Sequence, residues 1–145
     1  MTIKNFLITD FSDYISLFKN INLFKKNKII IFLKGELGSG KTTFVQKYLL
    51  YKYNFKNTSS PTFGIINTYM LNDTNIYHYD LYRITKPNEL YDIGFYDNLE
   101  TNTVHFIEWP EIIPEKMCSP NIIINFQPLI TERIISIDAL SLIHI

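Results

Sequence analysis

Apolar and polar positions along this 145-residue chain form a pattern of short strands and helices. Residues 29–33, IIIFL, are an unbroken apolar run, which is typical of a strand buried on both faces. Residues 43–53 contain neither Gly nor Pro and place apolar side chains at helical spacing. The pattern therefore predicts a buried strand, a short connection and then a helix.

An antiparallel hairpin is predicted in the middle of the chain. Residues 65–71 and 76–84 have the pattern of strands, and the polar stretch 72–75 joins them as a four-residue loop. A short helix over 87–91 would follow and end at Gly94.

Further strands are predicted where short apolar runs recur, at residues 3–8, 104–107, 122–126 and 134–139. In the last of these runs apolar residues alternate with Ser and Asp, so one face of that strand is expected to be solvated. Ser12 would cap a helix over 13–20.

Residues 35–42, GELGSGKT, connect the buried strand to the helix and carry the most specific chemistry in the chain. They match the phosphate-binding loop pattern G-x-x-x-x-G-K-[ST] through Gly35, Gly40, Lys41 and Thr42. Gly lets the backbone approach phosphates closely, and the N-terminus of the helix favours an anion. Lys41 would reach the β- and γ-phosphates, and the Thr42 hydroxyl would hold Mg²⁺. The alternative is an ordinary glycine-rich turn.

These elements predict an α/β fold. A strand, a glycine loop and a helix in this order indicate a three-layer P-loop NTPase fold with helices on both faces of the sheet. We expect a mixed, mostly parallel sheet that contains an antiparallel hairpin. The length predicts a single domain over residues 1–145.

Composition excludes several classes of protein. A hydrophobic fraction of 46% and a charged fraction of 19% exclude a disordered chain. Lys+Arg and Asp+Glu number 14 each, so no strongly basic nucleic-acid surface is indicated. Cys118 is the only cysteine, which excludes an internal disulfide and a cysteine metal cluster. Because no apolar run approaches the roughly 20 residues of a membrane helix, we expect a cytoplasmic protein without membrane contact.

Glu108 follows the apolar run at 104–107 directly. Phosphate-loop enzymes use such a strand to bring an acid, usually Asp, beside Mg²⁺. Glu is one methylene longer and would act directly or through a water. The alternative is an ordinary acid at the point where a strand emerges.

Asp80 lies in the segment HYDLYR at 78–83. On a strand, residues 78, 80 and 82 share a face, and an Asp among apolar neighbours is unfavourable unless it is paired or ligating. Asp80 would ligate Mg²⁺ through water or orient the attacking water; the alternative is an ion pair with Arg83 or a Lys. His78 is interpreted as a structural hydrogen-bonding residue and not as a base.

Three further residues each allow two interpretations. Thr62, in SPTF at 60–63, would sense the γ-phosphate as switch loops do, or it belongs to an ordinary turn. Trp109 packs in the core, or it meets a partner or substrate beside the metal site. Arg133 contacts the nucleotide or only solvates its strand.

The motifs in this order resemble the TsaE family, also called YjeE, which are bacterial P-loop ATPases of tRNA threonylcarbamoyladenosine biosynthesis. The matching segments are GELGSGKTTF (35–44), SPTF (60–63), YHYDLYR (77–83), EL followed by Gly94, IEWP (107–110) and Arg133. A phosphate loop alone occurs in hundreds of families, whereas this combination at this spacing is specific.

The resemblance implies a Mg²⁺-dependent ATPase. By this resemblance the phosphate loop maps to Gly38, Ser39, Gly40, Lys41, Thr42 and Thr43, the Mg²⁺ ligands to Thr42 and Glu108 with Asp80 nearby, and the tryptophan of the family's EW motif to Trp109. The family acts with the TsaD–TsaB complex, which transfers a threonylcarbamoyl group to the adenosine beside the tRNA anticodon. ATP hydrolysis is expected to support turnover of that complex, with tRNA contacts that are indirect or transient.

Two other classes of nucleotide-binding protein fit the sequence less well than an ATPase does. Small-molecule P-loop kinases normally carry an arginine-rich lid, which is hard to build when Arg83 and Arg133 are the only arginines. A GTPase would usually carry an Asn-Lys-x-Asp segment, and the sequence has none. Without an arginine finger of its own, the ATPase is expected to be slow alone and activated by its partner.

Overall fold

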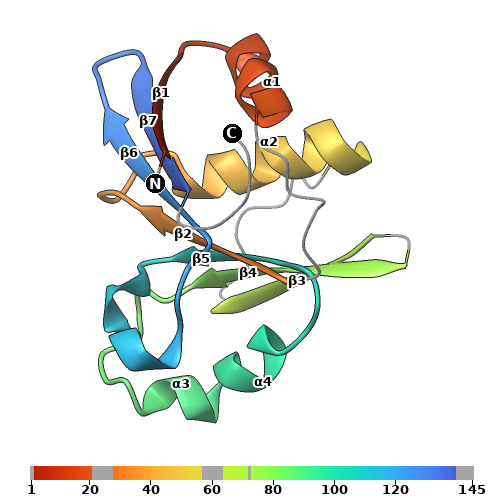
Figure 1. Ribbon diagram of the computed structural model, residues 1–145, viewed down its shortest axis with the longest axis vertical. Helices are drawn as coiled ribbons and strands as arrows, with labels where there is room; N and C mark the ends of the chain where they lie inside the picture. Colours follow the sequence, from red (N-terminus) through yellow and green to blue (C-terminus); the bar gives the residue numbers. More distant parts are fainter. Residues whose placement is uncertain (1, 21–27, 57–63, 72, 140–145) are drawn as a thin grey trace.

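The computed structural model describes residues 2–20, 28–56, 64–71 and 73–139. Within these residues, seven strands form one mixed sheet in the order β1-β7-β6-β2-β5-β4-β3 (Figure 1). The strands are β1 (Thr2–Ile8), β2 (Ile29–Lys34), β3 (Ile66–Leu71), β4 (Thr74–Asp80), β5 (Val104–Glu108), β6 (Ile122–Pro128) and β7 (Arg133–Ala139). The prediction of an α/β fold with a mixed sheet is confirmed.

The sheet is less parallel than the sequence pattern predicts. Of the six strand pairs in the described part of the chain, β6–β2, β2–β5 and β5–β4 are parallel. The pairs β1–β7, β7–β6 and β3–β4 are antiparallel. The prediction of a mostly parallel sheet is therefore wrong. Only residues 129–132 separate β6 from β7, and so short a connection joins antiparallel strands.

Helices cover both faces of the sheet, as predicted (Figure 1). The helices α1 (Phe11–Asn20) and α2 (Lys41–Tyr53) pack on one face. The short helices α3 (Glu89–Asp92) and α4 (Phe95–Leu99) cover the other face, with the 3₁₀ turns η1 (Pro110–Ile112) and η2 (Glu115–Met117) on the same side. The two faces hold separate apolar cores because side chains alternate along each strand.

Aromatic side chains fix α2 on the sheet. The ring of Phe44 packs edge-on against Phe106 of β5 at 6.4 Å and against Phe126 of β6 at 5.6 Å between centroids. Tyr48, one turn later, packs against Phe106 at 5.4 Å. These contacts hold the first turns of α2 against β5 and β6.

Several element boundaries differ from the predictions. The strand expected over 76–84 begins at Thr74 and ends at Asp80, so the hairpin loop is shorter than four residues. Asp10, and not Ser12, caps α1, because the Asp10 carboxylate accepts hydrogen bonds from the backbone N–H groups of Ser12 (3.0 Å) and Asp13 (3.4 Å).

Gly94 ends α3 as predicted, with φ of 73°, and it also begins α4, a helix that the sequence pattern did not reveal. The five residues of α4 are held by burial of Phe95 and Leu99 in the second apolar core. No helix in the described ranges has the length and apolar character needed to span a membrane.

Candidate functional site

The glycine loop, residues 35–40, connects β2 to α2. Gly38 and Gly40 have φ angles of 73° and 106°, which L-residues with a side chain rarely adopt. A Cβ at Gly40 would also overlap the guanidinium of Arg133. At Gly35 a Cβ would crowd the Phe126 carbonyl oxygen at 3.0 Å, so the base of the loop lies close against β6.

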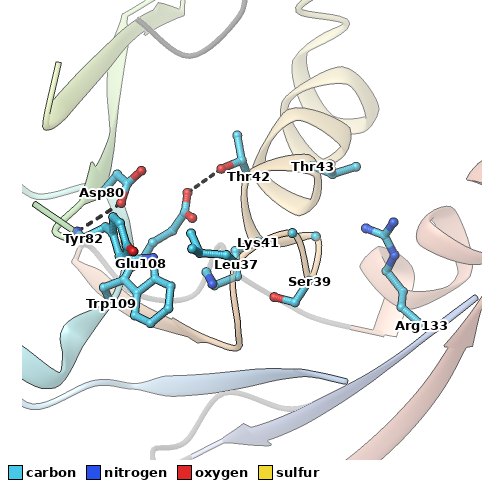
Figure 2. Close-up of a pocket in the computed structure, with 12 residues that line it drawn as sticks. Leu37, Ser39, Lys41, Thr42, Thr43, Asp80, Tyr82, Glu108, Trp109 and Arg133 are labelled. Carbon is cyan, nitrogen blue, oxygen red and sulfur yellow. Dashed lines mark hydrogen bonds between the residues drawn. The ribbon is translucent and has the colours of Figure 1, made fainter. Parts of the chain in front are cut away.

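A cleft of about 240 Å³ opens beside this loop (Figure 2). It is lined by Leu37, Gly38, Ser39, Gly40, Lys41, Thr42, Thr43, Asp80, Tyr82, Glu108, Trp109 and Arg133. The structure therefore brings the sequence-predicted site residues together, with two exceptions. Gly35, the first residue of the loop, does not line the cleft, and Thr62 lies outside the described residues.

Lys41 is the first residue of α2 and is buried. Its ammonium group donates hydrogen bonds to the backbone carbonyls of Gly35 and of Glu36, the latter at 2.9 Å. The same nitrogen lies 4.1 Å from the centre of the Trp109 ring. Burial lowers the pKa of Lys41, and the nearby carboxylates of Glu108 and Asp80 act in the opposite direction. The Lys41 ammonium is thus held at the loop, within reach of an anionic ligand in the cleft.

Glu108 ends β5 and is buried, 3% exposed. In the parallel register it lies beside Leu33 of β2 and beside Asp80 of β4. The Thr42 hydroxyl donates a hydrogen bond to Glu108 Oε2 at 2.9 Å (Figure 2), and His78 Nε2 contacts the same oxygen. The first turn of α2 is therefore joined to the end of a strand 66 residues away in the sequence.

Asp80 is the last residue of β4 and is partly exposed. Its carboxylate accepts a hydrogen bond from the backbone N–H of Tyr82 at 3.2 Å (Figure 2). The expectation that residue 82 shares a strand face with 78 and 80 is wrong, because the strand ends at Asp80 and the chain turns. This turn leaves the Tyr82 ring 54% exposed at the edge of the cleft.

Trp109 forms a wall of the cleft. Its backbone is left-handed, with φ of 59°, which is uncommon for a residue with a side chain. The indole ring contacts both the Lys41 ammonium and the Tyr82 ring, whose centroid is 5.0 Å away. The sharp turn after β5 thus places an aromatic face directly beside the charged groups.

Arg133 begins β7 and lies on the opposite side of the glycine loop from Glu108 (Figure 2). Its guanidinium packs against Gly40 and donates a hydrogen bond to the Tyr14 hydroxyl at 3.3 Å. Burial raises the pKa of Tyr14, with the positive charge of Arg133 opposing that shift. Arg133 is therefore held by α1 beside the N-terminus of α2.

A family model described as "Threonylcarbamoyl adenosine biosynthesis protein TsaE" matches residues 8–135. The chain belongs to the TsaE family. The TsaE protein of Rickettsia conorii is 43% identical over 107 residues, which cover 72% of this chain and 59% of that protein. The TsaE protein of Haemophilus influenzae is 36% identical over 99 residues, covering 66% and 63%. The chain thus spans about three fifths of the length of these TsaE relatives.

A solved structure has the same fold. The crystal structure of YdiB from Bacillus subtilis superposes with a TM-score of 0.70 at 23% identity and covers 97% of this chain and 87% of that chain. At this identity the likeness shows the fold alone.

Sequence reasoning missed several residues that line or support the cleft. Leu37 and Tyr82 lie inside the matching motifs, but their residue types alone do not indicate that they line the cleft. Tyr14 fits the apolar side of α1, and only the structure shows its hydroxyl against Arg133. The contact of His78 with Glu108 depends on the register of β4 against β5, which the sequence does not give.

The donors in the cleft suit a hard divalent cation. Within the described ranges, no cluster of three or more His, Cys, Asp or Glu side chains is placed to enclose a metal. Mg²⁺ usually binds through one or two carboxylates together with phosphate oxygens and water, and not in an all-protein cage. The hydroxyl of Thr42 and the carboxylate of Glu108 are oxygen donors of this kind.

Proposed function

We propose that this chain is the ATP-binding and ATP-hydrolysing subunit required for threonylcarbamoyl modification of the adenosine beside the anticodon in tRNAs. Family membership supports the pathway. The observation that supports ATP binding and hydrolysis is the hydrogen bond from the Thr42 hydroxyl to Glu108. Thr42 lies in the first turn of α2, which follows the glycine loop. A helix-start hydroxyl joined to an acid on the neighbouring strand is the arrangement that phosphate-loop enzymes use for nucleotide and Mg²⁺.

The glycine loop acts as the phosphate-binding loop of a P-loop NTPase fold. Left-handed Gly38 and Gly40 let the loop curve so that backbone N–H groups converge on an anion. The dipole of α2 adds favourable potential at the same point. Lys41 exchanges its contacts with the loop carbonyls for the β- and γ-phosphate oxygens. The Ser39 hydroxyl, 1% exposed and without a hydrogen-bond partner in the described residues, also fits a polar ligand.

Thr42 and Glu108 would hold Mg²⁺. The Thr42 hydroxyl donates a hydrogen bond to Glu108 Oε2, which leaves the lone pairs of the hydroxyl oxygen available to a cation. When bound, the ion neutralises charge that develops on the transferring phosphoryl group. Asp80 lies beside Glu108 and lines the cleft, and its partly exposed carboxylate would orient the attacking water.

Hydrolysis by the chain alone is slow. Lys41 and the loop amides stabilise developing negative charge, but Arg133, the sole arginine among the described residues that line the cleft, lies on the far side from Glu108. A group supplied by a partner would raise the rate by roughly 10³–10⁵. We propose that the TsaD–TsaB complex supplies this group, that the two meet in the cytoplasm, and that tRNA is engaged only indirectly. We also propose that residues 1–145 form one domain.

A multiple-turnover threonylcarbamoyl-transfer assay with TsaD, TsaB and tRNA tests this proposal. We expect repeated turnover only when the chain and ATP are both present, and a single round when Lys41→Ala replaces it. Equal turnover with and without the chain would contradict the pathway assignment.

A second assay separates the ATPase from the kinase alternative. ATP consumption by the purified chain is measured with water as acceptor and then with a panel of nucleosides and small alcohols. We expect phosphate release that no acceptor increases. ADP formation that depends on an acceptor would assign the cleft to phosphoryl transfer.

A further inference from the structure

We propose that His78 is a positioning residue that fixes the Glu108 carboxylate at the metal-binding side of the cleft. His78 has this role only if the cleft binds a nucleotide with Mg²⁺, so the inference rests on the proposed function. Its own content is that a buried histidine, which does not line the cleft, sets the geometry of the acid.

The geometry joins three elements at one oxygen atom. His78 lies two residues before Asp80 on β4, and Asp80 pairs with Glu108 in the parallel register, so His78 and Glu108 face the same side of the sheet. His78 Nε2 contacts Glu108 Oε2, the oxygen that also accepts the Thr42 hydroxyl at 2.9 Å. His78 is 2% exposed and Glu108 is 3% exposed, so water does not compete for these contacts. Oε1 takes no part in either contact.

The contact defines the tautomer of His78. We assign the ring proton to Nε2, which then donates a hydrogen bond to Glu108 Oε2, because a carboxylate oxygen is an acceptor. Nδ1 then has no hydrogen-bond partner among the described residues, although it is buried. A buried polar atom without a partner is unfavourable for folding. The arrangement therefore orients the Glu108 carboxylate but leaves Nδ1 of His78 without a hydrogen bond among the described residues.

A second buried histidine shows what a structural role looks like in this fold. His105 Nε2 donates to the Thr101 carbonyl at 2.8 Å, and its Nδ1 lies 2.9 Å from the Tyr79 hydroxyl. Both ring nitrogens are therefore paired, and His105 faces the apolar core on the other side of the sheet. His78 differs in two ways. Only one of its ring nitrogens has a partner among the described residues, and that partner is an acid that lines the cleft.

The identity of the acid explains the need for positioning. Glu has one more rotatable bond than Asp, so fixing its carboxylate loses more conformational entropy. The two donors on Oε2 hold that additional torsion before any ligand binds. His78 is in turn held by stacking on Tyr69, with ring centroids 6.4 Å apart and planes inclined by 21°.

The test compares His78→Phe with His78→Gln by calorimetric titration of ADP and ATP, in Mg²⁺ and in EDTA. Phe keeps a flat ring but removes the donor, whereas the Gln amide places an N–H group near the position of Nε2. We expect His78→Phe to weaken the Mg²⁺-dependent part of nucleotide binding by roughly 10- to 100-fold. Binding in EDTA stays within about twofold of the unmodified chain, and His78→Gln recovers most of the Mg²⁺ dependence.

Each contrary result has a distinct meaning. Unchanged Mg²⁺ dependence in His78→Phe would overturn the inference and leave the ATPase proposal intact. Equal losses in His78→Phe and His78→Gln, together with lower melting temperatures, would overturn it in favour of a purely structural role. Absence of Mg²⁺-dependent nucleotide binding in the unmodified chain would overturn the ATPase proposal and the inference with it.

A spectroscopic measurement on the ligand-free chain gives an independent readout. Long-range ¹H–¹⁵N spectra report which ring nitrogen of each histidine is protonated, and the His78→Gln variant assigns the His78 signals. We expect a proton on Nε2 of His78. An unprotonated Nε2 would overturn the inference whatever the binding data show.

Discussion

The two walls of the cleft are built in different ways. The loop wall consists of the glycine loop and the first turn of α2, which are continuous in sequence and offer backbone N–H groups and Lys41. The acid wall consists of the ends of β4 and β5, where Asp80 and Glu108 meet only because the strands pair in a particular register. In the proposed function the loop wall binds the phosphates directly, whereas the acid wall acts on them through Mg²⁺ and water. The two walls should therefore be separable by experiment.

The largest expected effect is at Lys41, on the loop wall. Replacing it with Ala removes the buried ammonium that the proposed function places beside the phosphates. We therefore expect nucleotide affinity to fall both with and without Mg²⁺. Hydrolysis should fall by roughly 10²–10³-fold. Calorimetry and phosphate release measure the two quantities.

Lys47→Ala is the matched control for Lys41. Lys47 lies on the same helix, with its ammonium 5.2 Å from the Phe11 ring, and does not line the cleft. Both quantities should be unchanged in this variant. A Lys41→Ala chain that still binds nucleotide normally in EDTA would remove the distinction between the walls.

Glu108→Gln tests the acid wall. The amide keeps the shape of the side chain but lacks the charge that attracts Mg²⁺, so we expect hydrolysis to fall about as far as in Lys41→Ala or somewhat less. Nucleotide affinity in EDTA should be retained, in contrast to Lys41→Ala. Glu111→Gln, at an exposed glutamate three residues later, serves as the control. Loss of nucleotide affinity in EDTA would contradict a role that depends on Mg²⁺.

Alanine substitutions at two glycines of the loop wall should have smaller effects, and the two effects should differ from each other. Alanine at Gly38 or Gly40 must adopt a left-handed conformation, which costs about 1–2 kcal/mol. A Cβ at Gly40 would in addition displace Arg133, whereas no atom lies within 4 Å of a Cβ built at Gly38. Thermal unfolding and nucleotide titration should therefore show a larger loss for Gly40→Ala.

A double variant separates the two causes at Gly40. Arg133→Ala removes the side chain that a Cβ at position 40 would overlap, so it should recover part of the stability lost in Gly40→Ala. Equal losses in Gly38→Ala and Gly40→Ala, with no recovery in the double variant, would show that Arg133 does not constrain the loop.

The smallest expected effect is at Tyr14. Tyr14→Phe removes only the hydroxyl that accepts a hydrogen bond from Arg133 at 3.3 Å. The net worth of such a bond is about 1 kcal/mol, so nucleotide affinity should change by no more than about fivefold. Because Arg133 lies far from Glu108, the change should be the same in Mg²⁺ and in EDTA. A change confined to Mg²⁺ would connect Arg133 to the acid wall.

The same division explains how much the sequence predicts. The buried β2, the loop and α2 follow from an apolar run, a glycine pattern and helical spacing over neighbouring residues. The strand that ends in Glu108 is also predicted from the sequence, because its residues are apolar except for His105 and the acid itself. All five of its residues are buried in the structure. Local pattern and local structure agree in these segments.

The rest depends on contacts between distant residues. The end of β4 at Asp80, which exposes Tyr82, is not marked by Gly or Pro. The contact of His78 with Glu108 requires strand register, and that of Arg133 with Gly40 requires β7 to lie beside β6. Helix α4 has only five residues and is held by tertiary burial, which no propensity reveals.

The most direct test of the central claim is a single-turnover measurement of phosphate release, with the purified chain in excess over ATP. The two-wall account predicts slow release that requires Mg²⁺, is lost in Lys41→Ala and Glu108→Gln, and persists in Lys47→Ala. Release at an unchanged rate in both Lys41→Ala and Glu108→Gln, or no release by the unmodified chain with Mg²⁺ and its partners present, would contradict it.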